Sequence, residues 1–78
     1  MYPLATEKAM RLLESENKIV LIVDKDTTRK EIKEGVEKEF GVKVEKVNIS
    51  VVKGGKKKAY VKVATGKAAD IATKLGVL

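Results

Sequence analysis

The sequence has 78 residues, a formal net charge of +6, and neither Cys nor His. This length is that of one small domain, so residues 1–78 are expected to share a single core. Without Cys there is no disulfide or thiolate metal site, and without His the commonest metal ligand and general base is missing. The longest apolar run, Ile19 to Val23, is too short to span a bilayer. We therefore expect an intracellular protein without membrane insertion.

The positive charge is concentrated in the second half of the chain. Residues 1–41 hold 8 Lys/Arg and 9 Asp/Glu, a net charge of −1, whereas residues 42–78 hold 9 Lys and 2 acidic residues, a net charge of +7. A surface that is merely soluble would mix the two signs, so this asymmetry favours a polyanionic partner on one side of the fold. Nearly all the basic residues are Lys, which indicates recognition of a phosphate backbone, because bidentate reading of guanine favours Arg.

The first half of the chain predicts a helix followed by a buried strand. The helix runs from Thr6 to Ser15, with Thr6 as an N-cap hydroxyl and Glu7 in the first turn, where the helix dipole favours a negative charge. The segment Lys18 to Asp24 contains five consecutive aliphatic residues. It is therefore predicted to be a strand covered on both faces.

A second helix is predicted between Thr28 and Phe40. Thr28 and Glu31 form a Thr-x-x-Glu capping box at its start, and a glycine follows its end. Beyond that glycine the alternation of apolar residues slips by one position. We therefore predict a bulge or bend near Glu45 and Lys46 that absorbs the odd residue.

The segment Val47 to Val63 has the pattern of a β-hairpin. Two alternating runs are separated by Lys53-Gly54-Gly55-Lys56, and the paired glycines supply the positive φ that a tight reversal requires. Alternation assigns one face to the core, namely Val47, Ile49, Val51, Ala59, Val61 and Val63. It assigns the other to a cationic face, namely Lys46, Asn48, Ser50, Lys58, Tyr60 and Lys62.

The last predicted element is a helix that opens at Thr65 or Gly66 and stops at Gly76. The predicted order of elements is α-β-α-β-β-α, which is an α+β fold. A right-handed crossover through the second helix would make the first two strands parallel, with the third strand antiparallel between them. We therefore predict a three-stranded sheet of order 2-3-1 packed against the helices.

Signals for catalysis and for metal binding are weak. The hydroxyls and carboxylates have no His or Cys to activate them, so we predict no catalytic residue, no cofactor and no small-molecule substrate. Asp24 and Asp26 have the chemistry of a Mg²⁺ pair, but acids between a strand and a helix commonly serve turns and caps. We predict no metal site. Gly66-Lys67 resembles the end of a phosphate-binding loop, yet Val61 stands where that motif needs Gly.

The cationic face is the candidate binding site. Its lysines have an alternative explanation, since an edge hairpin also uses lysines to stay soluble. Asn48 and Ser50 favour binding, because neutral donors suit phosphate or 2′-hydroxyl groups, and Tyr60 is either a stacking surface or a ring packed on lysine stems. An RNA-recognition motif is disfavoured, because its central strand needs several aromatics. The candidate RNA-binding residues are Lys46, Asn48, Ser50, Lys53, Lys56, Lys57, Lys58, Tyr60 and Lys62, with Lys8 as a further candidate.

Three short motifs, taken in their order and spacing, resemble one known family. Pro3 is followed by Thr6-Glu7-Lys8, Phe40 is followed by Val44-Glu45-Lys46-Val47-Asn48, and residues 57–61 read Lys-Lys-Ala-Tyr-Val. This pattern resembles the universal large-subunit ribosomal proteins numbered twenty-three, and the match covers nearly the whole chain.

The resemblance implies an α+β protein bound to large-subunit rRNA at the rim of the polypeptide exit tunnel, beside neighbouring ribosomal proteins. It implies a cytoplasmic, ribosome-bound protein that offers a docking surface to signal recognition particle or other nascent-chain factors. Glu7 matches the family's exposed acidic docking residue. The tip Lys53 to Lys56 is much shorter than the tunnel-reaching loop of bacterial members, and the basic amino-terminal extension of eukaryotic cytosolic members is absent. The compact form resembles archaeal members.

Two other function classes remain open from the residues alone. A small ferredoxin-like enzyme of the acylphosphatase type would need an arginine in a phosphate-cradling loop after the first strand, and Asp24 to Thr28 contains none. A protein-only interaction module would copurify with its partner in the absence of RNA.

Overall fold

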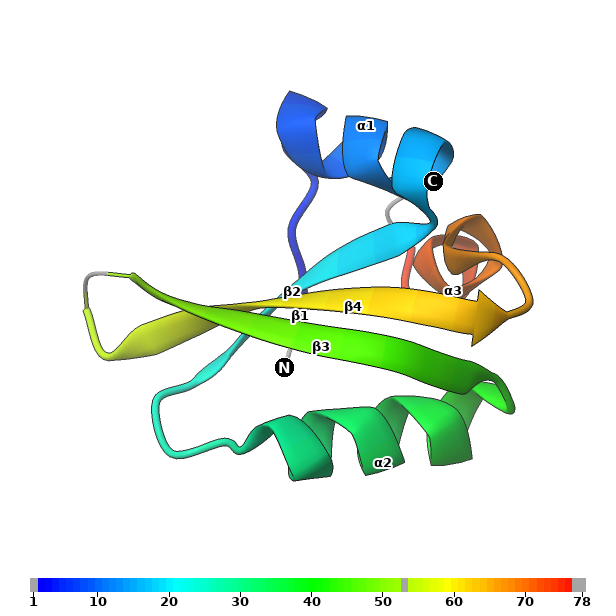
Figure 1. The fold of residues 1–78 in the computed structure, drawn as a ribbon. Coiled ribbons are helices and arrows are strands. Elements are labelled where there is room, and N and C mark those ends of the chain that lie inside the picture. Colours follow the sequence, from blue (N-terminus) through cyan, green and yellow to red (C-terminus); the bar gives the residue numbers. More distant parts are fainter. Residues whose placement is uncertain (1, 53, 77–78) are drawn as a thin grey trace.

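The computed structural model describes residues 2–52 and 54–76. Its elements in chain order are β1 (Tyr2–Pro3), α1 (Glu7–Glu16), β2 (Lys18–Asp24), α2 (Arg29–Phe40), β3 (Lys43–Val52), β4 (Lys56–Thr65) and α3 (Ala68–Lys74). Figure 1 shows the strands running between α1 above and α2 below, with α3 beside the end of β4. The hairpin of β3 and β4 reaches out on one side of the molecule.

The four strands form one sheet of order β1-β2-β4-β3, in which every hydrogen-bonded pair of strands is antiparallel. The prediction of a three-stranded sheet is wrong, because the sheet has four strands. Tyr2 and Pro3 add a fourth strand, opposite Ile22 and Leu21 of β2. A strand of two residues shows no alternation, so the sequence pattern gives no sign of it. β4 lies between β2 and β3, and those two strands do not pair with each other.

Local capping groups set the starts of α1 and α2. The Thr6 hydroxyl accepts a hydrogen bond from the Ala9 N–H at 3.2 Å, and the Thr28 hydroxyl accepts one from the Glu31 N–H at 3.2 Å. These bonds satisfy amide groups that have no partner inside the helix. Both predicted N-caps are confirmed. The carboxylate of Glu31 accepts from the Thr28 hydroxyl at 3.3 Å, which completes a side-chain pair at the start of α2.

α3 begins later than predicted, and its cap comes from a distant residue. Lys67, the residue before the helix, makes no capping bond with its side chain. Instead, Asn17 Oδ1 accepts the Ala68 N–H at 2.7 Å, and Asn17 Nδ2 donates to the carbonyl oxygens of Val63 and Gly66 at 3.0 and 3.1 Å. Asn17 also ends α1 in the left-handed region, at φ 55°. One side chain thus ties α1, β4 and α3 together.

The core is formed by alternate residues of three strands. Val61 of β4 lies opposite Ile19 of β2 and Val47 of β3, and Ala59 lies in the next such row between Leu21 and Ile49. These rows pack with Ile32 and Val36 of α2 and with Ala68, Ile71 and Ala72 of α3. All five aliphatic residues of β2 are buried, as predicted for a strand covered on both faces.

One predicted core residue, Val51, is 80% exposed. It lies opposite Lys57 near the tip of the hairpin, and Figure 1 shows this tip extending past the start of α2. Alternation predicted the correct side of the strand, but no helix covers that side near the tip. The turn itself agrees with the prediction, since Gly54 and Gly55 have φ values of 84° and 73°.

The predicted irregularity in β3 is confirmed. Val44 pairs with Val63 and Lys46 pairs with Lys62, so Glu45 has no partner on β4. A bulge of this kind restores the alternation of the strand and re-aims a side chain.

Candidate nucleic-acid interface

The register of β3 against β4 assembles the cationic face. Lys46 lies opposite Lys62, and Ser50 lies opposite Lys58. Residues directly opposite each other on antiparallel strands project from the same side of the sheet. The third pair of the face is Asn48 and Tyr60. The six residues that alternation predicted for the cationic face therefore do lie together, on a hairpin whose strands are each 10 residues long.

Two more lysines extend this side of the sheet. Lys18 of β2 lies opposite Lys62, and Lys56 lies at the other end of β4, opposite Asp24 and Val52. Lys56 was among the candidates, but Lys18 was not. The pattern around Lys18 indicated a buried strand, and its place beside Lys62 depends on how β2 pairs with β4. The signal that identifies Lys18 is therefore the strand register.

Not every candidate reaches this side. Lys57 lies opposite Val23 and Val51, on the other side of the sheet, because successive residues of a strand alternate. Lys53 lies outside the described residues. Lys8 belongs to α1, and not to the hairpin. The run of three lysines at positions 56–58 is thus divided between the two faces of the sheet.

Carboxylates already neutralise part of the charge. Lys56 Nζ lies 2.7 Å from Asp24 Oδ1, and Lys62 Nζ lies 3.2 Å from Glu45 Oε2. The hydrogen bond from Lys56, together with its charge, lowers the pKa of Asp24, and the same hydrogen bond and the charge of Asp24 raise the pKa of Lys56. Lys18 Nζ lies 3.2 Å from Glu16 Oε1.

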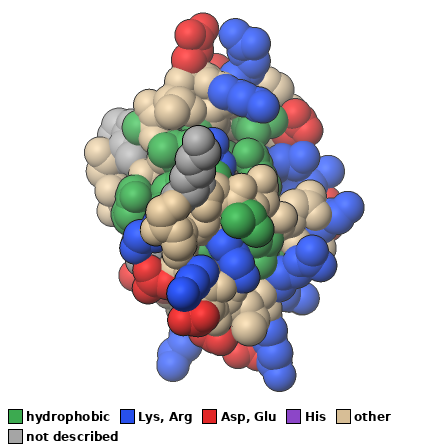
Figure 2. Space-filling model, turned by 90° about the vertical axis from the view of Figure 1, so that its left-hand side faces the viewer, with side chains coloured by type: hydrophobic (Ala, Val, Ile, Leu, Met, Phe, Trp, Pro, Cys, Tyr) green, Lys and Arg blue, Asp and Glu red, His purple; other side chains and the backbone are tan. Residues whose placement is uncertain are grey.

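Two lysines of the cationic face differ from these. Among residues 2–52 and 54–76, Lys46 and Lys58 form no ion pair. Contact between an anion and either of these lysines would therefore displace no carboxylate. Figure 2 shows Lys and Arg side chains gathered along the right-hand side of the view, whereas acidic side chains lie mainly toward the top and the bottom. In this view, basic side chains are most concentrated on that side, although some also stand beside the acidic ones at the top and the bottom.

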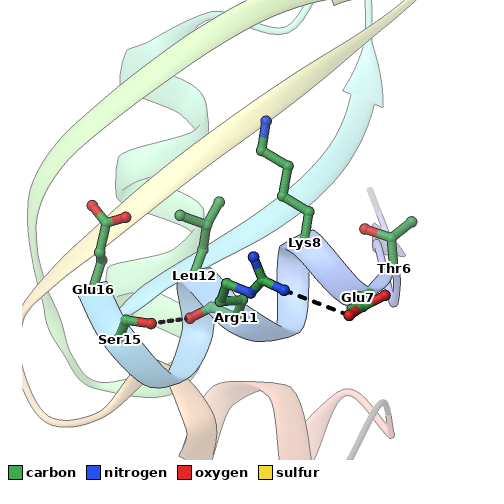
Figure 3. Close-up of a pocket in the computed structure, with 7 residues that line it drawn as sticks. All are labelled: Thr6, Glu7, Lys8, Arg11, Leu12, Ser15 and Glu16. Atoms are coloured by element: carbon green, nitrogen blue, oxygen red, sulfur yellow. Dashed lines mark hydrogen bonds and ion pairs between the residues drawn. The ribbon is translucent and has the colours of Figure 1, made fainter.

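A second surface feature is an open groove along α1. Glu7 is 91% exposed at its side chain, and its Oε1 lies 3.5 Å from Arg11 Nη2. Figure 3 shows this pair and the side chain of Lys8 projecting from the same helix. The groove is lined by Thr6, Glu7, Lys8, Arg11, Leu12, Ser15 and Glu16. The groove therefore carries side chains of both charges.

The described residues show no group of three or more acidic side chains placed to hold a metal ion. Asp24, one of the two acids considered for Mg²⁺, pairs with Lys56 instead. In the same part of the chain, every helix is too short or too polar to cross a bilayer.

Comparison with known proteins agrees with the resemblance found in the sequence. The family model described as ribosomal protein L23 matches residues 1–72. A large ribosomal subunit protein uL23 from the archaeon Pyrobaculum aerophilum is 57% identical over 74 residues, which are 94% of this chain and 91% of that protein. The chain therefore belongs to the ribosomal protein L23 family, a family of structural proteins of the ribosome and not of enzymes.

Proposed function

We propose that this protein is a constituent of the large ribosomal subunit and binds large-subunit rRNA through the cationic face. The observation that carries the proposal is the register of β4, which sets Lys62 opposite Lys46 and Lys58 opposite Ser50 on one side of the sheet. Family membership supports an RNA partner, because ribosomal proteins assemble with rRNA. As part of the ribosome, the protein works in the cytoplasm.

The chemistry of this face suits the RNA backbone. Lysines act as point charges on phosphates, and the amide of Asn48 and the hydroxyl of Ser50 are neutral donors for phosphate or 2′-hydroxyl groups. Tyr60 is partly buried and lies opposite Val20 on β2 and Asn48 on β3. A single such ring does not make a stacking platform, so contacts to the backbone dominate.

The proposal extends to the position on the ribosome. The family resemblance supports a place at the rim of the polypeptide exit tunnel, beside neighbouring ribosomal proteins. The exposed carboxylate of Glu7 supports a docking role for the groove along α1, toward signal recognition particle or another nascent-chain factor. Replacing Glu7 with Gln should weaken binding of that factor to the subunit, and replacing the exposed Glu14 of the same helix should not.

The test of rRNA binding is a salt titration of affinity. If about six phosphates are neutralised, the affinity for an rRNA fragment falls with salt with a log–log slope of roughly −4 to −5. Replacing Lys46, Lys58 and Lys62 together by Ala should weaken binding and reduce the size of that slope by about 2 to 3. A matched variant carries three exposed lysines of α2 replaced by Ala, at Lys30, Lys33 and Lys38.

The matched variant has the same change of net charge, but its lysines lie on α2. We expect its affinity and slope to stay close to those of the unmodified protein. A flat salt response, or equal losses in the two variants, would show that the cationic face is not the RNA-binding surface.

A further inference from the structure

A row of three lysines crosses the sheet on its cationic side. Lys62 of β4 lies directly opposite Lys18 of β2 and Lys46 of β3, and we call these three residues the lysine row. Like charges that face each other on neighbouring strands destabilise a sheet. A negative charge beside this row would therefore stabilise the protein in the absence of RNA.

Glu45 supplies such a charge at the centre of the row, where its Oε2 lies 3.2 Å from Lys62 Nζ. The chain beyond residue 41 contains just two acidic residues, and Glu45 is one of them. It is also the residue that the bulge leaves without a partner on β4, and bulges re-aim side chains. The most basic half of the chain thus directs one of its two carboxylates at the surface proposed to bind RNA.

The contact between Glu45 and Lys62 is one that an anion can replace. Their side chains are 54% and 44% exposed, and exposed ion pairs contribute little to stability because water and salt screen them. An RNA backbone offers several phosphates at once and releases counterions on binding, so it competes well against one carboxylate. Lys62 cannot pair equally well with Glu45 and with a phosphate at the same time, because the two anions repel each other.

We propose that Glu45 competes with RNA for Lys62. It pairs with Lys62 in the free protein, and an RNA phosphate displaces it from that lysine on binding. This inference rests on the proposed function of the cationic face. It adds that the free protein holds its own anion at the lysine row, which offsets the repulsion there and lowers the affinity for RNA. Glu16 has the same arrangement with Lys18 at the end of the row, at 3.2 Å.

The test replaces Glu45 with Gln, which keeps the size of the side chain and removes its charge. At moderate salt, the affinity for a large-subunit rRNA fragment should rise about 2- to 5-fold, the fold-change that corresponds to an exposed ion pair. Glu39→Gln is the matched control, because Glu39 is an exposed residue of α2 with the same charge change. Its effect on affinity should be smaller.

A second background isolates the contact itself. In a protein that already carries Lys62→Ala, the further change Glu45→Gln should give no more gain than Glu39→Gln, because the lysine that Glu45 occupies is gone. Far-ultraviolet circular dichroism of each variant checks that the fold is kept. A gain from Glu45→Gln that equals the control, or that persists without Lys62, overturns the inference and leaves the proposed function standing. If single Ala variants of Lys46, Lys58 and Lys62 all bind rRNA normally, the proposed function and this inference both fail.

Discussion

The two faces of the β3–β4 hairpin are built from alternate residues of the same two strands, yet they have different roles. On one face, Ala59 and Val61 are fully buried among core residues. On the other, Lys46, Asn48 and Ser50 are exposed. The comparison shows that one strand supplies stability through every second residue and surface charge through the residues between. Substitutions on the two faces should therefore affect different measurements.

The largest effect on stability is expected for Val61→Ala. Val61 has no exposed surface, and removing its two methyl groups loses apolar burial and leaves a cavity in the core. We expect the free energy of unfolding to fall by about 2 to 3 kcal/mol. Urea unfolding measures this change. Below the unfolding transition, the affinity for an rRNA fragment should stay within about 2-fold of that of the unmodified protein. A large loss of affinity would contradict the assignment of stability to one face and of binding to the other.

Asn17→Ala tests a polar residue that acts with the core. Its side chain makes three hydrogen bonds, to Val63, Gly66 and Ala68, and each is worth about 0.5 to 1.5 kcal/mol net. We expect a loss of about 2 kcal/mol in urea unfolding, since the amide of Ala68 also loses its cap. Asn17→Asp keeps the acceptor for Ala68 but turns a carboxylate oxygen toward the carbonyl oxygens of Val63 and Gly66, so it should also destabilise the protein. No loss in either variant would show that α3 is held by its apolar contacts alone.

Lys58→Ala and Lys57→Ala give the sharpest comparison of the two faces for binding. These neighbours undergo the same change, but Lys58 lies on the cationic face and Lys57 lies opposite Val23 and Val51. We expect Lys58→Ala to weaken rRNA binding about 5- to 10-fold near 0.1 M salt, because one phosphate contact is lost. Lys57→Ala should change the affinity less than 2-fold. Filter binding at fixed salt measures both, and similar losses would indicate diffuse electrostatic attraction.

The smallest effect is expected from Asp24→Asn. The hydrogen bond and charge of Lys56 lower the pKa of Asp24 in the folded protein. The carboxylate therefore adds stability at pH values above the ordinary Asp range, and this contribution is lost as the pH falls through the folded pKa. The variant should melt slightly lower at neutral pH and equally at strongly acidic pH. Asp26→Asn, two residues further along the chain, serves as the control in thermal unfolding. A difference from the unmodified protein that grows toward acid would contradict the assigned sign.

Features that depend on neighbouring residues were predictable from the sequence. The N-caps at Thr6 and Thr28, the glycine turn and the bulge at Glu45 all follow from local patterns, and the structure contains each of them. The alternation that defines the cationic face also follows a local rule. Applied strictly, the same rule would have set Lys57 apart from its two neighbours.

Features that depend on distant pairing were missed for a physical reason. β1 has two residues and gains its structure only by pairing with Leu21 and Ile22. The cap of α3 comes from Asn17, 51 residues away from Ala68. Lys18 joins the lysine row through the pairing of β2 with β4. None of these leaves a periodic signal in its own stretch of sequence, so the register of the sheet had to be known first.

The most direct test of the cationic face is lysine footprinting on intact large ribosomal subunits. Reductive methylation, read by mass spectrometry, compares each lysine of the bound protein with the same lysine of the free protein. We expect Lys46, Lys58 and Lys62 to be protected in the subunit and to regain reactivity after ribonuclease treatment, while Lys30 and Lys33 of α2 keep a higher reactivity throughout. Equal reactivity of Lys46, Lys58 and Lys62 in the bound and free protein would contradict the assignment of this face to rRNA.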